Sequence, residues 1–169
     1  LMGNLLWIAS YPKSGNTWVR AFLENYLQNS DRAVDINSLH QVSTAESYAH
    51  RFQKYLKEGQ KTTDLSAEQI CALRPMVQQD IAQQANGTVF VKTHNYYGEF
   101  EGHPLHNASV TSRAIYIVRN PLDVTLSMSN YFNYSIDEAI DYMAEEMTGT
   151  PNEVENVSQI ITSWSMHVE

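Results

Sequence analysis

The sequence predicts an α/β protein with a central, mostly parallel β-sheet. Three short apolar runs are typical of buried strands: LLWIAS at 5–10, TVFVKTH at 88–94 and AIYIVRN at 114–120. Segments with helical signals separate or follow these runs, and strands that alternate with helices form parallel sheets. At 169 residues, the chain has the length of one domain that can bury a core.

The first strand leads through a short polar loop into a helix. From Asn16 to Asn29, apolar side chains recur every three or four residues, as on one face of a helix. These side chains are Trp18, Val19, Phe22, Leu23, Tyr26 and Leu27. The next tract, residues 30–63, is polar and mixed, and we expect a helix over Ser47–Lys57 within a long excursion from the core.

A capped helix is expected before the second strand. Ser66 and Gln69 form a capping-box pattern that starts a helix over about 66–85. Pro75 is expected to kink or break this helix, and Asn86-Gly87 ends it.

Three helices are expected after the third strand. Pro121 fits the first turn of a helix that runs to about Phe132. Ser135 with Glu138 starts a second helix. Thr150-Pro151 separates it from a last helix near 154–168.

Charge and composition restrict the setting and the partners. The formal net charge is −8; residues 1–119 hold 11 basic and 10 acidic side chains, whereas residues 120–169 hold nine acidic ones and no Lys or Arg. A broad basic face for nucleic acid is therefore not expected. The sequence shows no apolar run of membrane-spanning length and no signal-peptide layout. Cys71 is the single cysteine, which excludes a disulfide framework and favours a reduced, cytoplasmic setting.

Four basic side chains follow the ends of the predicted strands. Lys13 follows the first strand, Lys92 and His94 end the second, and Arg119 ends the third. Ligands of parallel α/β sheets bind beyond the carboxyl ends of the strands. We therefore expect an anionic ligand at this edge.

The loop after the first strand has the features of a phosphate-binding turn. A glycine-containing turn at a helix start points backbone N–H groups and the positive end of the helix dipole at one place. Lys13 adds a full charge, but it precedes Gly15, whereas the nucleotide triphosphatase loop places its lysine after two glycines. A Mg²⁺–ATP site is therefore not expected. The remaining histidines have no metal-binding spacing: His40, His50, His103, His106 and His167.

Four segments together resemble the motifs of one enzyme family. They are YPKSGNTWVR at 11–20, VKTH at 91–94, YIVRNPLDVTLSMSNYF at 116–132 and SWSMHVE at 163–169. In this order they resemble the 5′-phosphosulfate loop, the catalytic-histidine strand, the 3′-phosphate segment and a further segment of cytosolic-type sulfotransferases. These enzymes use 3′-phosphoadenosine 5′-phosphosulfate (PAPS). The resemblance implies a P-loop-like three-layer α/β/α fold and a single sulfotransferase domain over 1–169, the N-terminal two thirds or so of the usual length.

The resemblance also implies which residues hold the donor. The 5′-phosphate and the sulfuryl group would be bound by Lys13, Ser14, Gly15, Asn16 and Thr17. Trp18 would stack on the adenine, because an aromatic face is a platform for any base. Arg119 and Ser127 would bind the 3′-phosphate through the guanidinium fork and the hydroxyl.

The same resemblance implies a mechanism without a metal. His94 would act as general base and take the proton from a hydroxyl or amine of a small acceptor. Lys13 would neutralise the leaving phosphate, and Lys92 would support the transferring group, as in phosphoryl transfer. The product nucleotide would be 3′-phosphoadenosine 5′-phosphate (PAP). The identity of the acceptor and the oligomeric state stay open.

Two departures from the family pattern keep alternatives open. Asn95-Tyr96-Tyr97-Gly98 follows VKTH, where cytosolic-type members usually have apolar residues and a proline; its tyrosines and Phe100 suit an acceptor pocket or the core. The family's Arg-Lys-Gly clamp on the 3′-phosphate has no counterpart, so we expect either a fragment of a full enzyme or a reduced homologue. A non-catalytic PAPS- or PAP-binding homologue is the alternative function, and a nucleotide kinase is a third. Taken singly, Trp18 also fits a core position, and His94 also fits a hydrogen-bonded histidine at a strand end.

Overall fold

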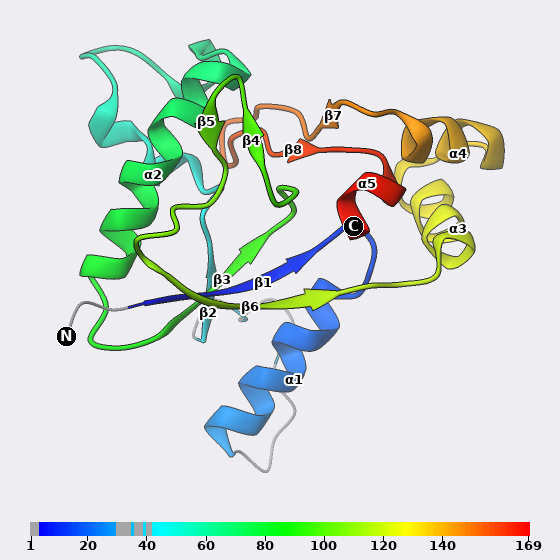
Figure 1. Cartoon of the computed structure of the whole chain (residues 1–169), viewed down its shortest axis with the longest axis horizontal. Coiled ribbons are helices and arrows are strands. Elements are labelled where there is room, and N and C mark those ends of the chain that lie inside the picture. The colour runs from blue at the N-terminus through cyan, green and yellow to red at the C-terminus, as the bar shows by residue number, and fades with distance from the viewer. Residues whose placement is uncertain (1–3, 30–34, 36–38, 40–41) are drawn as a thin grey trace.

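The computed structural model describes residues 4–29, 35, 39 and 42–169. Its central sheet has four strands in the order β2-β3-β1-β6, and all neighbouring strands are parallel. These strands are β1 (Leu5–Ser10), β2 (Ser43–Ala45), β3 (Val89–Thr93) and β6 (Thr111–Ile117). The predicted α/β fold with a parallel sheet is confirmed (Figure 1).

Helices cover both faces of this sheet. They are α1 (Asn16–Gln28), α2 (Ala67–Gln83), α3 (Pro121–Phe132), α4 (Ile136–Ala144) and α5 (Trp164–Val168). Figure 1 shows α1 on one side of the sheet and α2 on the other, which gives the three expected layers. Two short hairpin-like pairs complete the strands: β4 (Glu99–Phe100) with β5 (His103–Pro104), and β7 (Thr148–Gly149) with β8 (Ile160–Ile161).

The main apolar core lies between the sheet and α2. Successive side chains of a strand point to opposite faces, so Leu5 and Trp7 of β1 share one face. They form a buried cluster with Val91 of β3 and with Ile70 and Val77 of α2. The other face of β1 is therefore left for α1 and for the loop that joins them.

A second buried cluster fixes the start of that loop. Tyr11, the first residue after β1, is fully buried and packs with Val124 and Met128 of α3. Ala139 of α4 and Ile161 of β8 belong to the same cluster. Since α3 follows β6, this packing holds the loop after β1 against the helix after β6.

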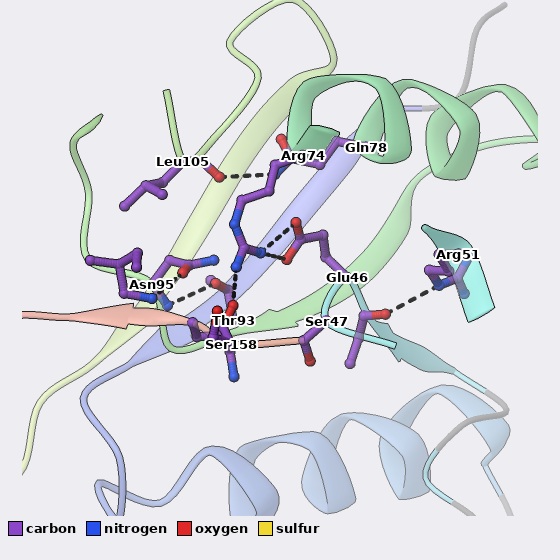
Figure 2. A network of polar contacts seen from close by, with 12 residues as sticks. Glu46, Ser47, Arg51, Arg74, Gln78, Thr93, Asn95, Leu105 and Ser158 are labelled. Atoms are coloured by element: carbon purple, nitrogen blue, oxygen red, sulfur yellow. Dashed lines mark hydrogen bonds and ion pairs between the residues drawn. The ribbon is translucent and has the colours of Figure 1, made fainter. Parts of the chain in front are cut away.

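A buried ion pair joins the sheet to α2 (Figure 2). Arg74 of α2 donates to both carboxylate oxygens of Glu46, at 2.7 and 2.5 Å, and also to the main-chain carbonyl of Ser158. Both charged side chains are almost completely buried. The guanidinium thereby links the residue after β2, helix α2 and the segment that precedes β8.

The capping signals predicted from the sequence are confirmed. Ser66 and Gln69 form a reciprocal capping box at the start of α2, and Ser135 with Glu138 does the same for α4. Pro121 occupies the first turn of α3. The suggested break at Pro75 is wrong, because α2 continues through it.

The predicted helix over Ser47–Lys57 is wrong. The structure has two single 3₁₀ turns there, Ala49–Arg51 and Gln53–Tyr55. The main chain beside them pairs with a distant segment: Ala49 N–H donates to Glu155, and Val157 N–H donates to Ser47. These long-range hydrogen bonds replace the ladder that a continuous helix would need.

The predicted last helix near 154–168 is correct only for Trp164–Val168. Upstream of it the chain is extended, and Ile160–Ile161 pairs with Thr148–Gly149. The main chain of Ile160 also bonds to residues that follow β3, because Tyr96 N–H donates to its carbonyl. The apolar residues of this segment are thus buried as a strand.

Helix α1 is confirmed, but its apolar stripe faces away from the sheet. Trp18 is 82 % exposed, and Phe22 and Tyr26 on the same stripe are exposed as well. The helix instead buries Asn16 and Glu24. A core role for Trp18 is therefore excluded.

Candidate functional site

The register of the sheet brings the predicted site residues to one edge. Ala9 of β1 lies beside Thr93 of β3, and Ser10 of β1 lies beside Ile117 of β6. All three strands therefore end at the same level. The residues that follow these ends are the ones predicted to hold an anion: Lys13, His94 and Arg119.

The loop between β1 and α1 is a tight turn that ends on a helix N-terminus. Gly15 is the N-cap of α1 and has φ of 105°, a conformation that favours glycine. Lys13 has φ of 63°, which is uncommon for a residue with a Cβ atom. Ser14 between them is buried, and its hydroxyl has no hydrogen-bond partner within the described residues. This buried hydroxyl and the free N–H groups of the helix start can serve a bound anion.

Lys13 and Arg119 meet at this loop. The Arg119 guanidinium donates to the Lys13 carbonyl at 3.1 Å, and the Lys13 ammonium lies 3.5 Å from the centre of the Tyr131 ring. Burial and the neighbouring Arg119 charge lower the pKa of Lys13. Ser127 precedes Tyr131 by one helical turn of α3 and therefore shares the face that Lys13 contacts.

Neither of these cations has a carboxylate partner in the described part of the chain. The ion pairs found there join Lys54 to Asp80 and Arg74 to Glu46. Lys92 also lacks such a partner within the same residues. Unpaired cations close together repel one another, and an anionic ligand removes that cost.

The Asn16 side chain holds the strand rather than facing a ligand. Its amide donates to the carbonyl of Ile8 at 2.9 Å and to the hydroxyl of Ser10 at 3.2 Å. Asn16 thereby fixes the carboxyl end of β1 from the first turn of α1. Its main-chain N–H at the helix start is the part that can serve a phosphate, and the exposed Thr17 follows it.

His94 has a tautomer that its neighbours define. Its Nδ1 atom lies 2.8 Å from the carbonyl oxygen of Ser10 and 3.3 Å from the hydroxyl of that residue. A carbonyl oxygen only accepts hydrogen bonds, so Nδ1 carries the proton. The lone pair of the neutral ring is therefore on Nε2, the arrangement that a general base requires.

Burial, together with the neighbouring charges, keeps His94 neutral. Burial and the neighbouring charge of Lys92 lower the pKa of His94 to about 3. Burial and the charge of Arg20 lower the pKa of Lys92 to about 8. At neutral pH the ring is uncharged, whereas Lys92 remains mostly protonated.

Arg20 is a site residue that the sequence reasoning missed. Its guanidinium donates to the hydroxyl of Ser43 on β2 at 2.7 Å, and its charge acts on both Lys92 and His94. The signal was its spacing: Arg20 lies four residues after Asn16 and therefore on the same face of α1.

The aromatic residues after β3 divide between two environments. Tyr96 and Phe100 pack against a buried cluster that contains Leu105 and Ile160. Tyr97 is exposed and lies at the rim of an apolar cavity of about 640 Å³. Trp7, Tyr116 and His167 line this cavity as well, but His94 does not. Of Tyr96, Tyr97 and Phe100, which were expected in a pocket or in the core, Tyr97 lines a cavity and the other two pack in the core.

Comparison with known proteins identifies one family. The family model described as Sulfotransferase domain matches residues 4–169 of this chain. No curated protein matches the sequence.

Among the described residues, no group of three or more His, Cys, Asp or Glu side chains is placed to hold a metal ion. The helices in this part of the chain are all too short or too polar to cross a membrane.

Proposed function

This chain belongs to the sulfotransferase domain family, and we propose that it transfers a sulfuryl group from PAPS to a hydroxyl or amine of a small acceptor. The observation that supports this proposal is the edge of the sheet where Lys13 and Arg119, which have no carboxylate partner among the described residues, lie beside a turn suited to a phosphate. The neutral His94 ring, with its lone pair on Nε2, follows the neighbouring strand. A nucleotide with phosphates on both sides of its ribose suits this distribution of charge.

The residues present fit the donor. The unpartnered Ser14 hydroxyl and the start of α1 suit the 5′-phosphosulfate, with Lys13 beside them. Arg119 and Ser127 lie on the α3 side of Lys13 and suit the 3′-phosphate. Trp18 is exposed on the first turn of α1 and can offer a ring face to the adenine.

PAPS supplies an activated sulfuryl group, so the protein's task is to orient two substrates and to stabilise charge. Lys13 and the N–H groups of the loop stabilise negative charge on the leaving phosphate. Lys92 offers its charge to the sulfuryl oxygens. Nε2 of His94 accepts the proton of the acceptor hydroxyl or amine. Negative charge of the bound donor favours the imidazolium and so raises the pKa of His94 from its low resting value.

Calorimetric titration tests the donor. We expect PAP to bind more tightly than adenosine 5′-phosphate, which lacks the 3′-phosphate that Arg119 and Ser127 would contact. Charge-assisted hydrogen bonds of this kind contribute about 1.5–3 kcal/mol, which corresponds to a difference of roughly ten- to hundredfold in affinity. Equal affinity for the two nucleotides would contradict the assignment of the 3′-phosphate site.

Replacement of His94 tests the base. His94→Ala should abolish turnover while PAP still raises the melting temperature, because the substitution leaves the loop cations in place. The control is His50→Ala, since His50 is exposed on a 3₁₀ turn and is not among the candidate site residues; the turnover of this variant should be unchanged. Turnover that survives His94→Ala removes His94 from the mechanism.

The parent chain also tests the non-catalytic alternative. PAP binding without transfer to any of a broad panel of phenols, alcohols and amines would favour that alternative.

A further inference from the structure

The main chain of His94 is held from both sides by the C-terminal segment. Its N–H donates to the Gln159 side-chain oxygen at 2.8 Å, and its carbonyl accepts from Nε2 of His167 at 3.0 Å. Both side chains are buried, at 7 % and 6 % exposure. Two residues from a distant part of the chain therefore complete the hydrogen bonds of one candidate catalytic residue.

The bonds from Gln159 and His167 take the place of strand-to-strand hydrogen bonds just beyond the end of β3. Strand β3 ends at Thr93, so the main-chain groups of His94 lie beyond its pairing with β1 and β2. A buried main-chain group without a hydrogen-bond partner destabilises the fold. Gln159 and His167 satisfy the two groups that the strand end leaves open.

The segment that carries Gln159 is itself fixed. The N–H of Gln159 donates to the Thr150 hydroxyl at 2.8 Å, and its carbonyl accepts from the Thr150 N–H at 3.0 Å. On the next residue, the N–H of Ile160 donates to the side-chain oxygen of Asn95 at 2.8 Å. Figure 2 shows Ser158, the preceding residue, beside Thr93 and Asn95, where its carbonyl is bound by the buried Arg74. These hydrogen bonds hold the segment that carries Gln159, whose side-chain oxygen accepts from the His94 N–H.

His167 is oriented in a similar way. The His94 carbonyl only accepts hydrogen bonds, so the Nε2 atom of His167 must carry a proton. On the other side of the ring, Nδ1 lies 2.6 Å from the Tyr116 hydroxyl, on strand β6. The His167 ring therefore spans from β6 to the residue that follows β3.

We infer that Gln159 and His167 are positioning residues, which fix the His94 main chain and thereby the position of its ring. This inference rests on the proposed function of His94 as the base. The ring is held at Nδ1 by Ser10, and the main chain is held by the two C-terminal side chains. The loss of either main-chain bond lets the backbone shift and moves the ring with it.

The test compares variants of the full chain that remove or retain each bond. His167→Leu removes the donor to the His94 carbonyl, and Gln159→Met removes the acceptor of its N–H. His167→Gln is the matched control, because its side-chain amide retains an N–H near the position of Nε2. We expect kcat to fall roughly ten- to hundredfold in the first two variants, since small displacements of a catalytic group cost this much. PAP affinity should not change, and His167→Gln should recover most of the loss.

A readout that does not depend on turnover accompanies the kinetics. Hydrogen exchange of the His94 amide should accelerate in Gln159→Met, and ¹⁵N spectra should show the proton of the His94 ring on Nδ1 in the parent chain. In the variants, the ring should exchange between tautomers. An equal loss of kcat in His167→Gln and His167→Leu would overturn the inference, as would an unchanged kcat in both His167→Leu and Gln159→Met. A parent chain without turnover refutes the proposed function, and the amide exchange and ring tautomer then decide whether the two residues fix His94.

Discussion

Lys92 combines a buried ammonium with a place in the candidate donor site. Desolvation, and then the charge of Arg20, lower its pKa from 10.5 to about 8. The folded-state pKa lies below the value of an exposed lysine, so Lys92 loses its proton at a lower pH than an exposed lysine does. Its positive charge is present at neutral pH and is lost as the pH rises past about 8.

We therefore predict that PAPS affinity declines as the pH rises through the pKa of Lys92. The neutral amine no longer attracts the anion, whereas Lys13 and Arg119 still do, so the decline is partial. Bound anion favours the charged amine and moves the midpoint in the complex above about 8. Calorimetry with PAPS, without an acceptor, across neutral and alkaline pH measures the effect.

Lys92→Arg is the control for this prediction. A guanidinium stays charged throughout this range, so the alkaline decline should disappear in the variant. A decline of the same size in Lys92→Arg would assign it to another group. In the ligand-free protein the His94 ring is already neutral between pH 5 and pH 8, with a pKa of about 3, so its own titration does not contribute to the alkaline decline.

The positions of some site residues follow from the order of the parallel strands, whereas the positions of others depend on individual side-chain contacts. Lys13, His94 and Arg119 are predicted to converge, because the carboxyl ends of parallel strands lie at one edge, and the register brings the ends of β1, β3 and β6 to one level. The hydrogen bonds of Asn16 to β1 and the charge of Arg20 beside Lys92 were not predicted. These contacts depend on the direction of individual side chains, which residue spacing alone does not determine.

At the scale of elements, the Glu46–Arg74 pair connects parts that share no sheet ladder (Figure 2). It joins β2, α2 and the Ser158 carbonyl, and Ser158 precedes the residue that binds the His94 N–H. Breaking the pair leaves one charge buried without a partner, whereas replacing both residues removes the charges together. Breaking a buried pair is the more costly change.

We predict that Glu46→Leu destabilises the protein by about 3–5 kcal/mol, because it leaves the Arg74 guanidinium buried and unpaired. The double variant with Arg74→Met should lose less, since neither charge then remains in the core. Urea unfolding at neutral pH measures both free energies. A double variant as unstable as Glu46→Leu, or more so, would show that the ion pair itself stabilises the fold.

The elements that were predicted correctly carry local signals. The capping boxes of α2 and α4 and the proline of α3 mark helix starts within four residues of sequence. The short strands β2, β4, β5, β7 and β8 were not predicted. A strand of two or three residues shows no alternation. β8 pairs with β7 and also bonds to Asn95 and Tyr96, which lie far away in the sequence. For the same reason its apolar residues were assigned to a helix.

At the scale of the whole molecule, the charge of −8 and the cationic site occupy different parts of the chain. Residues 120–169 hold nine acidic side chains and no Lys or Arg, and helix α4 within them carries Asp137, Glu138 and Asp141. The cations of the candidate donor site come from the first 119 residues. Charges more than about 10 Å away are largely screened at ordinary ionic strength, so attraction of an anion depends mainly on the charges close to the site.

Buried histidines should make the whole protein sensitive to mild acid. Burial is the main cause that lowers the pKa of His94 to about 3 and that of His106 to about 4, whereas both would titrate near 6.5 in the unfolded chain. Below pH 6.5 the unfolded state binds protons that the folded state does not, so the free energy of unfolding decreases as the pH is lowered. We predict this fall between pH 6.5 and pH 5, where most carboxylates are still ionised.

Replacement of His106 isolates its contribution to this prediction. His106→Phe keeps a ring that can lie edge-on to Trp7 and removes the titrating group. Each histidine that stays neutral in the folded state adds a slope of up to about 1.4 kcal/mol per pH unit, so the variant should show a shallower dependence. Urea midpoints measured at several pH values give the slopes of both proteins. Parallel curves would mean that His106 titrates alike in the folded and unfolded chains, and the acid sensitivity would then belong to His94, His167 or the carboxylates.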